Sequence, residues 1–350
     1  METVAVFPLL AHPAEYRACE TDLLIDEAAR TYWLDLFETA FEIQLQASAS
    51  VGSDAAACDR ARKTLKHALG EIRRHPAWHG RLDILLLDML RREALHENNI
   101  IDEFRLIKQR ENDAALAALP ARLSELDAAA GPELMEQLVR GILAGNLFDM
   151  GVPGTASRYA RRTIPFRETL AGLPARPWLF DGLEKASAWL INHVPRRVVI
   201  FADNAGADVV LGLLPLARYL INHGIEVIVA ANHRPALNDV TAGELRDLVQ
   251  RAAEADRIFA SPLLRIADSG SASPLIDLAQ ISDELADAAA GADLVILIGM
   301  GRGIESNWAA PFTCASWRIA MLKDPQVAMS VGGAMYDAVV RFDLPRRVDP

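Results

Sequence analysis

Two polar segments carry side chains that could hold a metal ion. Asp203 and Asn204 directly follow the apolar run at 196–202 (RRVVIFA), and Asp239 follows the run at 226–231 (EVIVAA) across a short loop. Two carboxylates brought close together repel each other unless a cation lies between them. Oxygen atoms of Asp and Asn suit Mg²⁺, Mn²⁺ and similar ions. We therefore expect these three residues to hold a divalent metal, which could polarise a phosphoryl oxygen and activate a water molecule.

The same residues have an ordinary structural alternative. Asp and Asn after a strand commonly cap the following helix or form a turn. For Asp203-Asn204 and for Asp239, spacing alone leaves both interpretations open. The occurrence of both segments at the ends of neighbouring apolar runs favours the metal interpretation.

A glycine-rich segment follows a third apolar run. Residues 299–303 (GMGRG) come directly after 293–298 (DLVILI). Glycine lets backbone N–H groups approach an anion, and Arg302 could clamp phosphate oxygens, although a plain turn with a solvated Arg is the alternative. A dinucleotide fingerprint is disfavoured because Ile304 stands where its third glycine is required. Lys323 is a second candidate phosphate cation, although an isolated Lys usually lies on the surface.

The elements that would position these residues form an α/β pattern. Continuous apolar runs alternate with helix-periodic segments, as is typical of a parallel sheet covered on both faces. In such a sheet the carboxyl ends of the strands line the ligand crevice. The expected strands are 196–202, 226–231, 293–298 and 325–331, and the expected helices between them are 206–222 and 241–255.

The first half of the chain is expected to be helical. Apolar residues recur at helical spacing, and no β-branched strand is expected before residue 196. The predicted helical segments are 24–48, 81–97, 111–130 and 133–145. Prolines near residue 190 mark a transition, so we predict a helical domain at 1–190 and a Rossmann-like α/β metal-binding domain at 191–350.

Composition limits the partners. The 350 residues are 51% hydrophobic, with a formal net charge of −11 and a pI near 5.3. This charge argues against nucleic-acid binding, which needs a basic surface. No apolar run approaches the roughly 20 residues that span a bilayer, and no signal peptide is recognised. We expect no membrane partner and a cytoplasmic location, while a homo-oligomer stays possible. Three distant cysteines predict neither a disulfide framework nor a zinc site.

The segment 201–241 (FADNAGADVVLGLLPLARYLINHGIEVIVAANHRPALNDVT) resembles the metal-dependent damage-control phosphatase family, formerly domain of unknown function 89. The likeness is to its subfamily II, the branch that includes the phosphatase domain of pantothenate kinase 4. Ordered matches extend over nearly the whole chain: RTYWLDLFE at 30–38, IKQRENDAAL at 107–116, LAGNLFDMG at 143–151, DSGSASPLIDL at 268–278 and ADLVILIGMGR at 292–302.

The resemblance implies a phosphomonoester phosphatase with a divalent ion, Mn²⁺, Co²⁺, Ni²⁺ or Mg²⁺. It implies that Asp203, Asn204 and Asp239 bind the metal. We expect Asp203 or Asp239 to orient or deprotonate the attacking water, with a covalent aspartyl-phosphate as the alternative. The implied substrate is 4′-phosphopantetheine or its oxidised or damaged forms. The expected substrate- and phosphate-binding residues are Gly299, Gly301, Arg302, Lys323, Asn146 and Asp149.

One departure leaves the substrate open. The subfamily signature EGMGR begins with Glu, whereas this chain has Ile298. Two alternatives therefore stand beside the phosphopantetheine expectation. One is a sugar-phosphate phosphatase of the same family, and the other is a catalytically weakened phosphopantetheine-binding regulatory module. For Asn146, helix C-capping by the Gly145-Asn146 pair is the local alternative to a place in the cleft.

Overall fold

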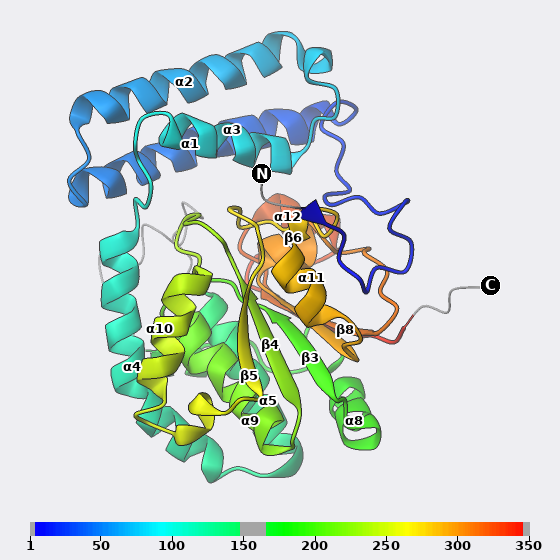
Figure 1. The fold of residues 1–350 in the computed structure, drawn as a ribbon. Coiled ribbons are helices and arrows are strands. Elements are labelled where there is room, and N and C mark those ends of the chain that lie inside the picture. The colour runs from blue at the N-terminus through cyan, green and yellow to red at the C-terminus, as the bar shows by residue number, and fades with distance from the viewer. Residues whose placement is uncertain (1–3, 148–165, 346–350) are drawn as a thin grey trace.

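A seven-stranded sheet organises the chain (Figure 1). The computed structural model describes residues 4–147 and 166–345. The strand order is β2-β9-β8-β7-β3-β4-β5, and every neighbouring pair is parallel except β8 and β9. The strands are β2 (Phe180–Asp181), β3 (Arg197–Phe201), β4 (Glu226–Ala231), β5 (Leu264–Asp268), β7 (Leu294–Ile298), β8 (Ala315–Met321) and β9 (Ala338–Asp343). The expected α/β class with a mostly parallel sheet is confirmed. A separate antiparallel pair joins β1 (Val4–Ala5) to β6 (Ile281–Ser282).

The central strands are buried on both faces. Along β3, Val198 and Ile200 belong to one hydrophobic cluster, while Val199 and Phe201 belong to another on the opposite face. This alternation follows from the period of two in a β-strand. Because both faces are covered, the strand has no polar alternation, and its continuous apolar run is the signal by which it was predicted.

Helices cover both faces of the sheet. The face of Val198 packs against α4, α5, α8, α9 and α10, and the face of Val199 packs against α11. The helices are α1 (Glu27–Ser50), α2 (Ala55–Arg74), α3 (Ile84–His96), α4 (Arg105–Asp127), α5 (Gly131–Asn146), α7 (Phe166–Ala171), α8 (Leu183–His193), α9 (Leu214–Asn222), α10 (Ala242–Ala252), α11 (Asp283–Ala289) and α12 (Pro325–Ser330). Short helical turns are η1 (Pro76–His79), η2 (Asp208–Leu213), η3 (Arg257–Ala260) and η4 (Gly301–Glu305).

The helices α1, α2 and α3 form a separate layer at one end of the molecule (Figure 1). Their hydrophobic cluster also contains Leu275 and Met300 from loops beside the sheet. By contrast, α4 and α5 share the main cluster with the sheet although they lie in the expected helical half. The division near residue 190 stays a prediction.

One expectation about strands is wrong. Residues 325–330 form α12 instead of a strand, because Asp324 caps the backbone N–H groups of Gln326 and Val327 and Pro325 occupies the first helical turn. Before residue 196 the structure has only the short strands β1 and β2 among the described residues, with two residues each, which are too short to show a period.

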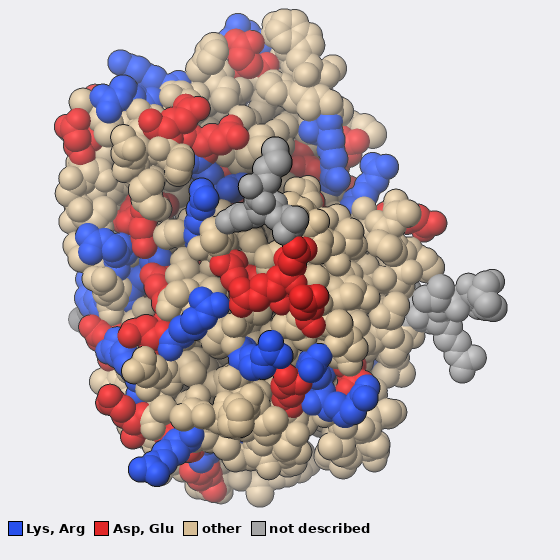
Figure 2. Space-filling view, in the orientation of Figure 1, with Lys and Arg blue, Asp and Glu red and all other residues tan. Residues whose placement is uncertain are grey.

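Charged side chains of both signs are interspersed on the face shown in Figure 2, where acidic side chains gather near its middle. On α11, Asp283, Glu284 and Asp287 are all exposed. No helix in the described ranges 4–147 and 166–345 has the length and apolar character needed to cross a membrane.

Candidate active site at the strand ends

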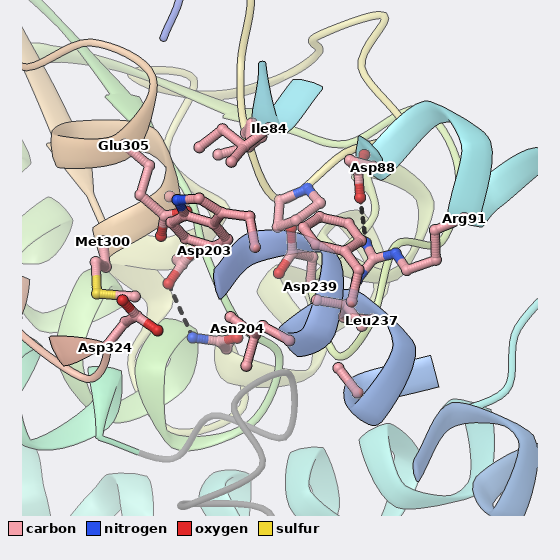
Figure 3. Close-up of a pocket in the computed structure, with 17 residues that line it drawn as sticks. Ile84, Asp88, Arg91, Asp203, Asn204, Leu237, Asp239, Met300, Glu305 and Asp324 are labelled. Atoms are coloured by element: carbon pink, nitrogen blue, oxygen red, sulfur yellow. Dashed lines mark hydrogen bonds and ion pairs between the residues drawn. The ribbon is translucent and has the colours of Figure 1, made fainter. Parts of the chain in front are cut away.

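Asp203, Asn204 and Asp239 lie together where two parallel neighbours, β3 and β4, end. Backbone pairing continues beyond the strands, because the Val240 N–H donates to the Asp203 carbonyl oxygen at 3.0 Å. Asn204 and Asp239 also form an isolated antiparallel bridge. This pairing brings the three side chains to the wall of one cavity of about 110 Å³ (Figure 3).

Amide groups fix the orientation of the Asp203 carboxylate. Its Oδ2 accepts hydrogen bonds from Asn146 Nδ2 at 2.7 Å and from Asn204 Nδ2 at 2.9 Å. Its Oδ1 accepts from Arg302 Nη1. Because the nitrogen of Asn204 is engaged in this way, its Oδ1 is the atom through which Asn204 would bind a cation.

Arg302 lies between the two carboxylates. It is 2% exposed, and its Nη2 donates to Asp239 Oδ2 at 2.8 Å and to Asn232 Oδ1 at 3.1 Å. Burial acts to lower the pKa of Arg302, but the carboxylates of Asp239 and Asp203 outweigh it and raise that pKa. The guanidinium therefore serves as the counterion of the acidic pair, and its expected contact with a phosphate stays a prediction.

Asp208 is a buried carboxyl group that the sequence did not single out. Its Oδ2 accepts from Asn204 Nδ2 at 3.0 Å and from Asn146 Nδ2 at 3.2 Å. Its Oδ1 has no hydrogen-bond partner among the described residues. Burial, followed by the negative charge of Asp203, raises the pKa of Asp208 to about 7. The available signal was an acidic residue one helical turn beyond the Asp203-Asn204 pair.

Asn146 and Lys323 connect the end of α5 to the end of β8. Both side chains are buried. Asn146 Oδ1 accepts from the Met321 N–H at 3.1 Å, and Lys323 Nζ donates to the Asn146 carbonyl oxygen at 2.7 Å. Asn146 thus faces the site through its side chain, and Lys323 is not on the surface. The other expected residue of this segment, Asp149, lies outside the described residues.

The glycine segment allows close packing. Gly299 has a φ of +95°, and a Cβ atom there would lie 2.3 Å from the Asp203 Cγ atom. Its N–H donates to the Ile319 carbonyl oxygen at 3.0 Å, so that amide is used within the sheet. A Cβ atom at Gly301 would lie 2.5 Å from the Pro274 carbonyl oxygen. Phosphate binding by this segment stays a prediction. The Ile298 side chain is fully buried in the main hydrophobic cluster.

The wall opposite the acidic residues comes from α1 and α3, and sequence reasoning missed it. Figure 3 shows Ile84, Asp88 and Arg91 of α3 around the same space as Asp203 and Asp239. The apolar side chains of this cavity are Trp33, Leu36, Phe37 and Ala40 of α1, Ile84 of α3, Leu237, Pro274, Leu275 and Met300. The cavity therefore combines the acidic strand ends with a wall that is largely apolar and also carries Asp88 and Arg91.

The donor set fits a hard divalent cation. Asp203 and Asp239 supply carboxylate oxygens and Asn204 an amide oxygen, which leaves further positions for water or substrate, as is usual for Mg²⁺. Three buried carboxyl groups, including Asp208, face the cations Arg302 and Lys323, so additional positive charge would stabilise the site. Within residues 4–147 and 166–345, no group of three or more His, Cys, Asp or Glu side chains is arranged to hold a metal.

Comparison with known proteins yields consistent matches. Residues 38–339 match the family model described as the damage-control phosphatase ARMT1-like domain. The chain is 37% identical to damage-control phosphatase At2g17340 of Arabidopsis thaliana, with 96% of each protein covered. It is 38% identical to pantothenate kinase 2 of the same plant, over 98% of this chain and 42% of the relative.

Two further relatives extend the comparison. The chain is 30% identical to the 4′-phosphopantetheine phosphatase of Mus musculus, over 97% of this chain and 48% of the relative. The crystal structure of a DUF89 family protein from Pyrococcus horikoshii superposes with a TM-score of 0.65 at 16% identity, covering 90% of this chain and 98% of that one. At this identity the likeness extends to the fold alone.

Proposed function

The chain belongs to the damage-control phosphatase ARMT1-like domain family and is a phosphatase, and we propose that it hydrolyses 4′-phosphopantetheine or its oxidised or damaged forms with the help of a divalent metal ion. The observation that carries this proposal is the cavity that joins Asp203, Asn204 and Asp239 to an apolar wall. A phosphate group would lie at the acidic end with the metal, and an extended organic chain would lie along α1 and α3.

In this proposal, Asp203, Asn204 and Asp239 hold the metal ion. When bound, the metal would supply Lewis-acid stabilisation of the phosphoryl oxygens and lower the pKa of a water molecule. Asp203 or Asp239 orients the attacking water and accepts its proton. The amides of Asn146 and Asn204 keep the Asp203 carboxylate in one orientation, so little reorganisation accompanies the reaction.

Arg302 and Lys323 neutralise the carboxylates around the substrate. Phosphomonoester dianions are repelled by an acidic site, so these two buried cations reduce the repulsion that the substrate meets. Trp33 and Phe37 give the α1 side of the cavity an apolar surface. This wall favours a substrate with an extended tail, and the mouse relative named for 4′-phosphopantetheine supports the same class.

A phosphate-release screen tests the proposal. The purified protein is assayed with Mn²⁺, Co²⁺, Ni²⁺ and Mg²⁺ against 4′-phosphopantetheine, fructose phosphates and p-nitrophenyl phosphate. We expect 4′-phosphopantetheine to have the highest kcat/KM. A preference for fructose phosphates would support the sugar-phosphate alternative, and binding without phosphate release with any ion would support the regulatory module.

Asp203→Asn separates the metal role from folding. The substitution keeps the shape of a side chain that is 6% exposed but removes the charge that would bind the metal. We expect metal-dependent turnover to fall by at least 100-fold, because a carboxylate ligand is lost. Circular dichroism checks that the fold is retained, and Asp287→Asn on the exposed face of α11 is the matched control. Wild-type turnover in Asp203→Asn would contradict the assignment.

A further inference from the structure

The cavity at the acidic site adjoins a larger cavity of about 670 Å³. The two share Arg91 and Leu237 as wall residues. Leu237 lies in the loop that carries Asp239, and its φ of +53° is a left-handed conformation that is unfavourable for a residue with a side chain. The same loop therefore places Asp239 in the smaller cavity and Leu237 where the two cavities meet.

One face of α1 and one face of α3 line both cavities. On α1, the smaller cavity is lined by Trp33, Phe37 and Ala40, and the larger cavity is lined by Gln44. On α3, the smaller cavity is lined by Ile84 and Asp88, the larger cavity is lined by Leu95, and Arg91 lines both cavities. Residues three or four apart share a helix face. The stretch from Trp33 to Gln44 covers about 16 Å at 1.5 Å per residue. This length suits a ligand shaped like a chain more than a compact ring.

Two residues that line the larger cavity each carry a buried polar atom with no hydrogen-bond partner in the described part of the chain. Arg91 is 5% exposed, and its Nη2 donates to Asp88, but its Nε has no acceptor. Gln44 is 2% exposed, and its Nε2 donates to Glu103 Oε1 at 2.7 Å, but its Oε1 has no donor. A polar atom that is buried without a partner is unfavourable, because it has lost its hydrogen bonds to water.

An amide group carries the two functions that these atoms lack. Its carbonyl oxygen can accept from the Arg91 Nε–H, and its N–H can donate to Gln44 Oε1. Arg91 is already held in place, because its guanidinium lies 5.5 Å from the centre of the Phe37 ring and pairs with Asp88. Asp88 in turn accepts from Ser273 Oγ at 2.6 Å. A donor that is fixed before binding loses little entropy when the ligand arrives.

We propose that the larger cavity is the subsite for the substrate tail and that Arg91 and Gln44 recognise an amide group in that tail. This inference rests on the proposed function, since it places the phosphate at Asp203 and Asp239. It names Arg91 and Gln44 as specificity-determining residues of this phosphatase. Both act on the end of the substrate that is remote from the reacting phosphorus atom.

Binding of pantetheine, which has the amide-containing tail but no phosphate, tests the subsite without hydrolysis. The dissociation constant is measured by isothermal titration calorimetry on the full chain. We expect wild type to bind and Gln44→Met to bind about tenfold more weakly, because one hydrogen bond of about 1.4 kcal/mol is lost. Gln46→Met, at an exposed position of the same helix, is the matched control and should bind like wild type.

Arg91→Lys provides a second variant, because it keeps a positive charge beside Asp88 and removes the Nε donor. It should also bind pantetheine about tenfold more weakly, and it keeps the test decisive if Gln44→Met fails to fold. Absence of pantetheine binding by wild type would overturn the subsite proposal. An unchanged dissociation constant in every folded variant would overturn it as well.

Phosphate release separates this proposal from the proposed function. If both are right, Gln44→Met lowers the ratio of kcat/KM for 4′-phosphopantetheine to that for p-nitrophenyl phosphate by about tenfold, because the second substrate has no amide. If wild type binds pantetheine and Gln44→Met binds it weakly, but neither protein releases phosphate from either substrate with any divalent ion, the subsite proposal is supported and the proposed function is wrong. If wild type hydrolyses both substrates and this ratio of kcat/KM values is unchanged in Gln44→Met and Arg91→Lys, the proposed function is supported and the subsite proposal is wrong.

Discussion

Asp208→Asn should change how the stability of the protein depends on pH. Burial and the nearby charge of Asp203 raise the pKa of Asp208 from 3.8 to about 7. The unfolded chain therefore loses this proton at lower pH than the folded chain does. Wild type loses stability as the pH rises from 3.8 toward 7, because the folded state binds more protons over that window.

The magnitude follows from the size of the shift. About three pKa units at about 1.4 kcal/mol each amount to ~4 kcal/mol lost between pH 3.8 and pH 7, of which about two units, or ~3 kcal/mol, fall above pH 5. Asn at position 208 does not titrate, so its variant lacks this loss. Its own amide N–H, placed where Asp208 Oδ1 has no partner among the described residues, adds a cost of about 1–3 kcal/mol that is independent of pH.

The assay is urea unfolding of both proteins at pH 5, 6, 7 and 8 with a chelator present, so that bound metal does not alter the charge of the site. We expect the free energy of unfolding of Asp208→Asn minus that of wild type to increase by ~3 kcal/mol from pH 5 to pH 7 and then to level off. Asp287→Asn on the surface of α11 controls for the change in net charge. Parallel pH profiles for wild type and Asp208→Asn would refute the reasoning.

Two further substitutions test the packing and the electrostatics of the site. Gly299→Ala should lower both the melting temperature and metal-dependent turnover, because the added Cβ atom would lie 2.3 Å from Asp203 Cγ and a φ of +95° costs about 1–3 kcal/mol for any other residue. Differential scanning calorimetry and a phosphate-release assay measure the two effects. Gly291→Ala is the control that separates backbone strain from the clash, because Gly291 has a φ of +73° but open space around it. Arg302→Met should destabilise the metal-free protein by about 3–5 kcal/mol, because Asp203 and Asp239 lose their shared buried counterion. Added divalent metal should restore part of this stability, as measured by thermal unfolding. Equal melting temperatures of the variant with and without metal would count against a metal site between the two carboxylates.

The sheet was predictable where a single strand carried its own signal. β3, β4 and β7 are buried on both faces, so each is a continuous apolar run. β8 is equally buried, but Arg318 interrupts its apolar pattern. The Arg318 side chain is tolerated inside because it donates to the carbonyl oxygens of Asn307 and Ala310 at 3.0 and 2.9 Å and pairs with Asp343. These partners lie outside β8, in the segment before the strand and at the end of β9, so the pattern of β8 itself does not reveal them.

The acidic site was predictable for a similar reason. The strand β3 is followed directly by Asp203 and Asn204, and β4 is followed by Asp239 across a short loop. Neighbouring parallel strands have their carboxyl ends at the same edge of the sheet. Their convergence therefore needs only the order of the strands. The resemblance of the surrounding segments to a phosphatase family then supplied a chemistry that spacing alone left open between a metal site and helix caps.

Only the tertiary structure decided what surrounds these three residues. Arg302 lies three residues after Gly299, the glycine that packs against Asp203, and its guanidinium meets both carboxylates, whereas the sequence suggested only a phosphate contact. Asp208 shares the amides of Asn146 and Asn204 because α5 packs closely against η2. The wall carrying Gln44 and Arg91 comes from helices more than a hundred residues earlier in the chain. Local patterns record what a residue does within its own element, while contacts between elements depend on how the whole core packs.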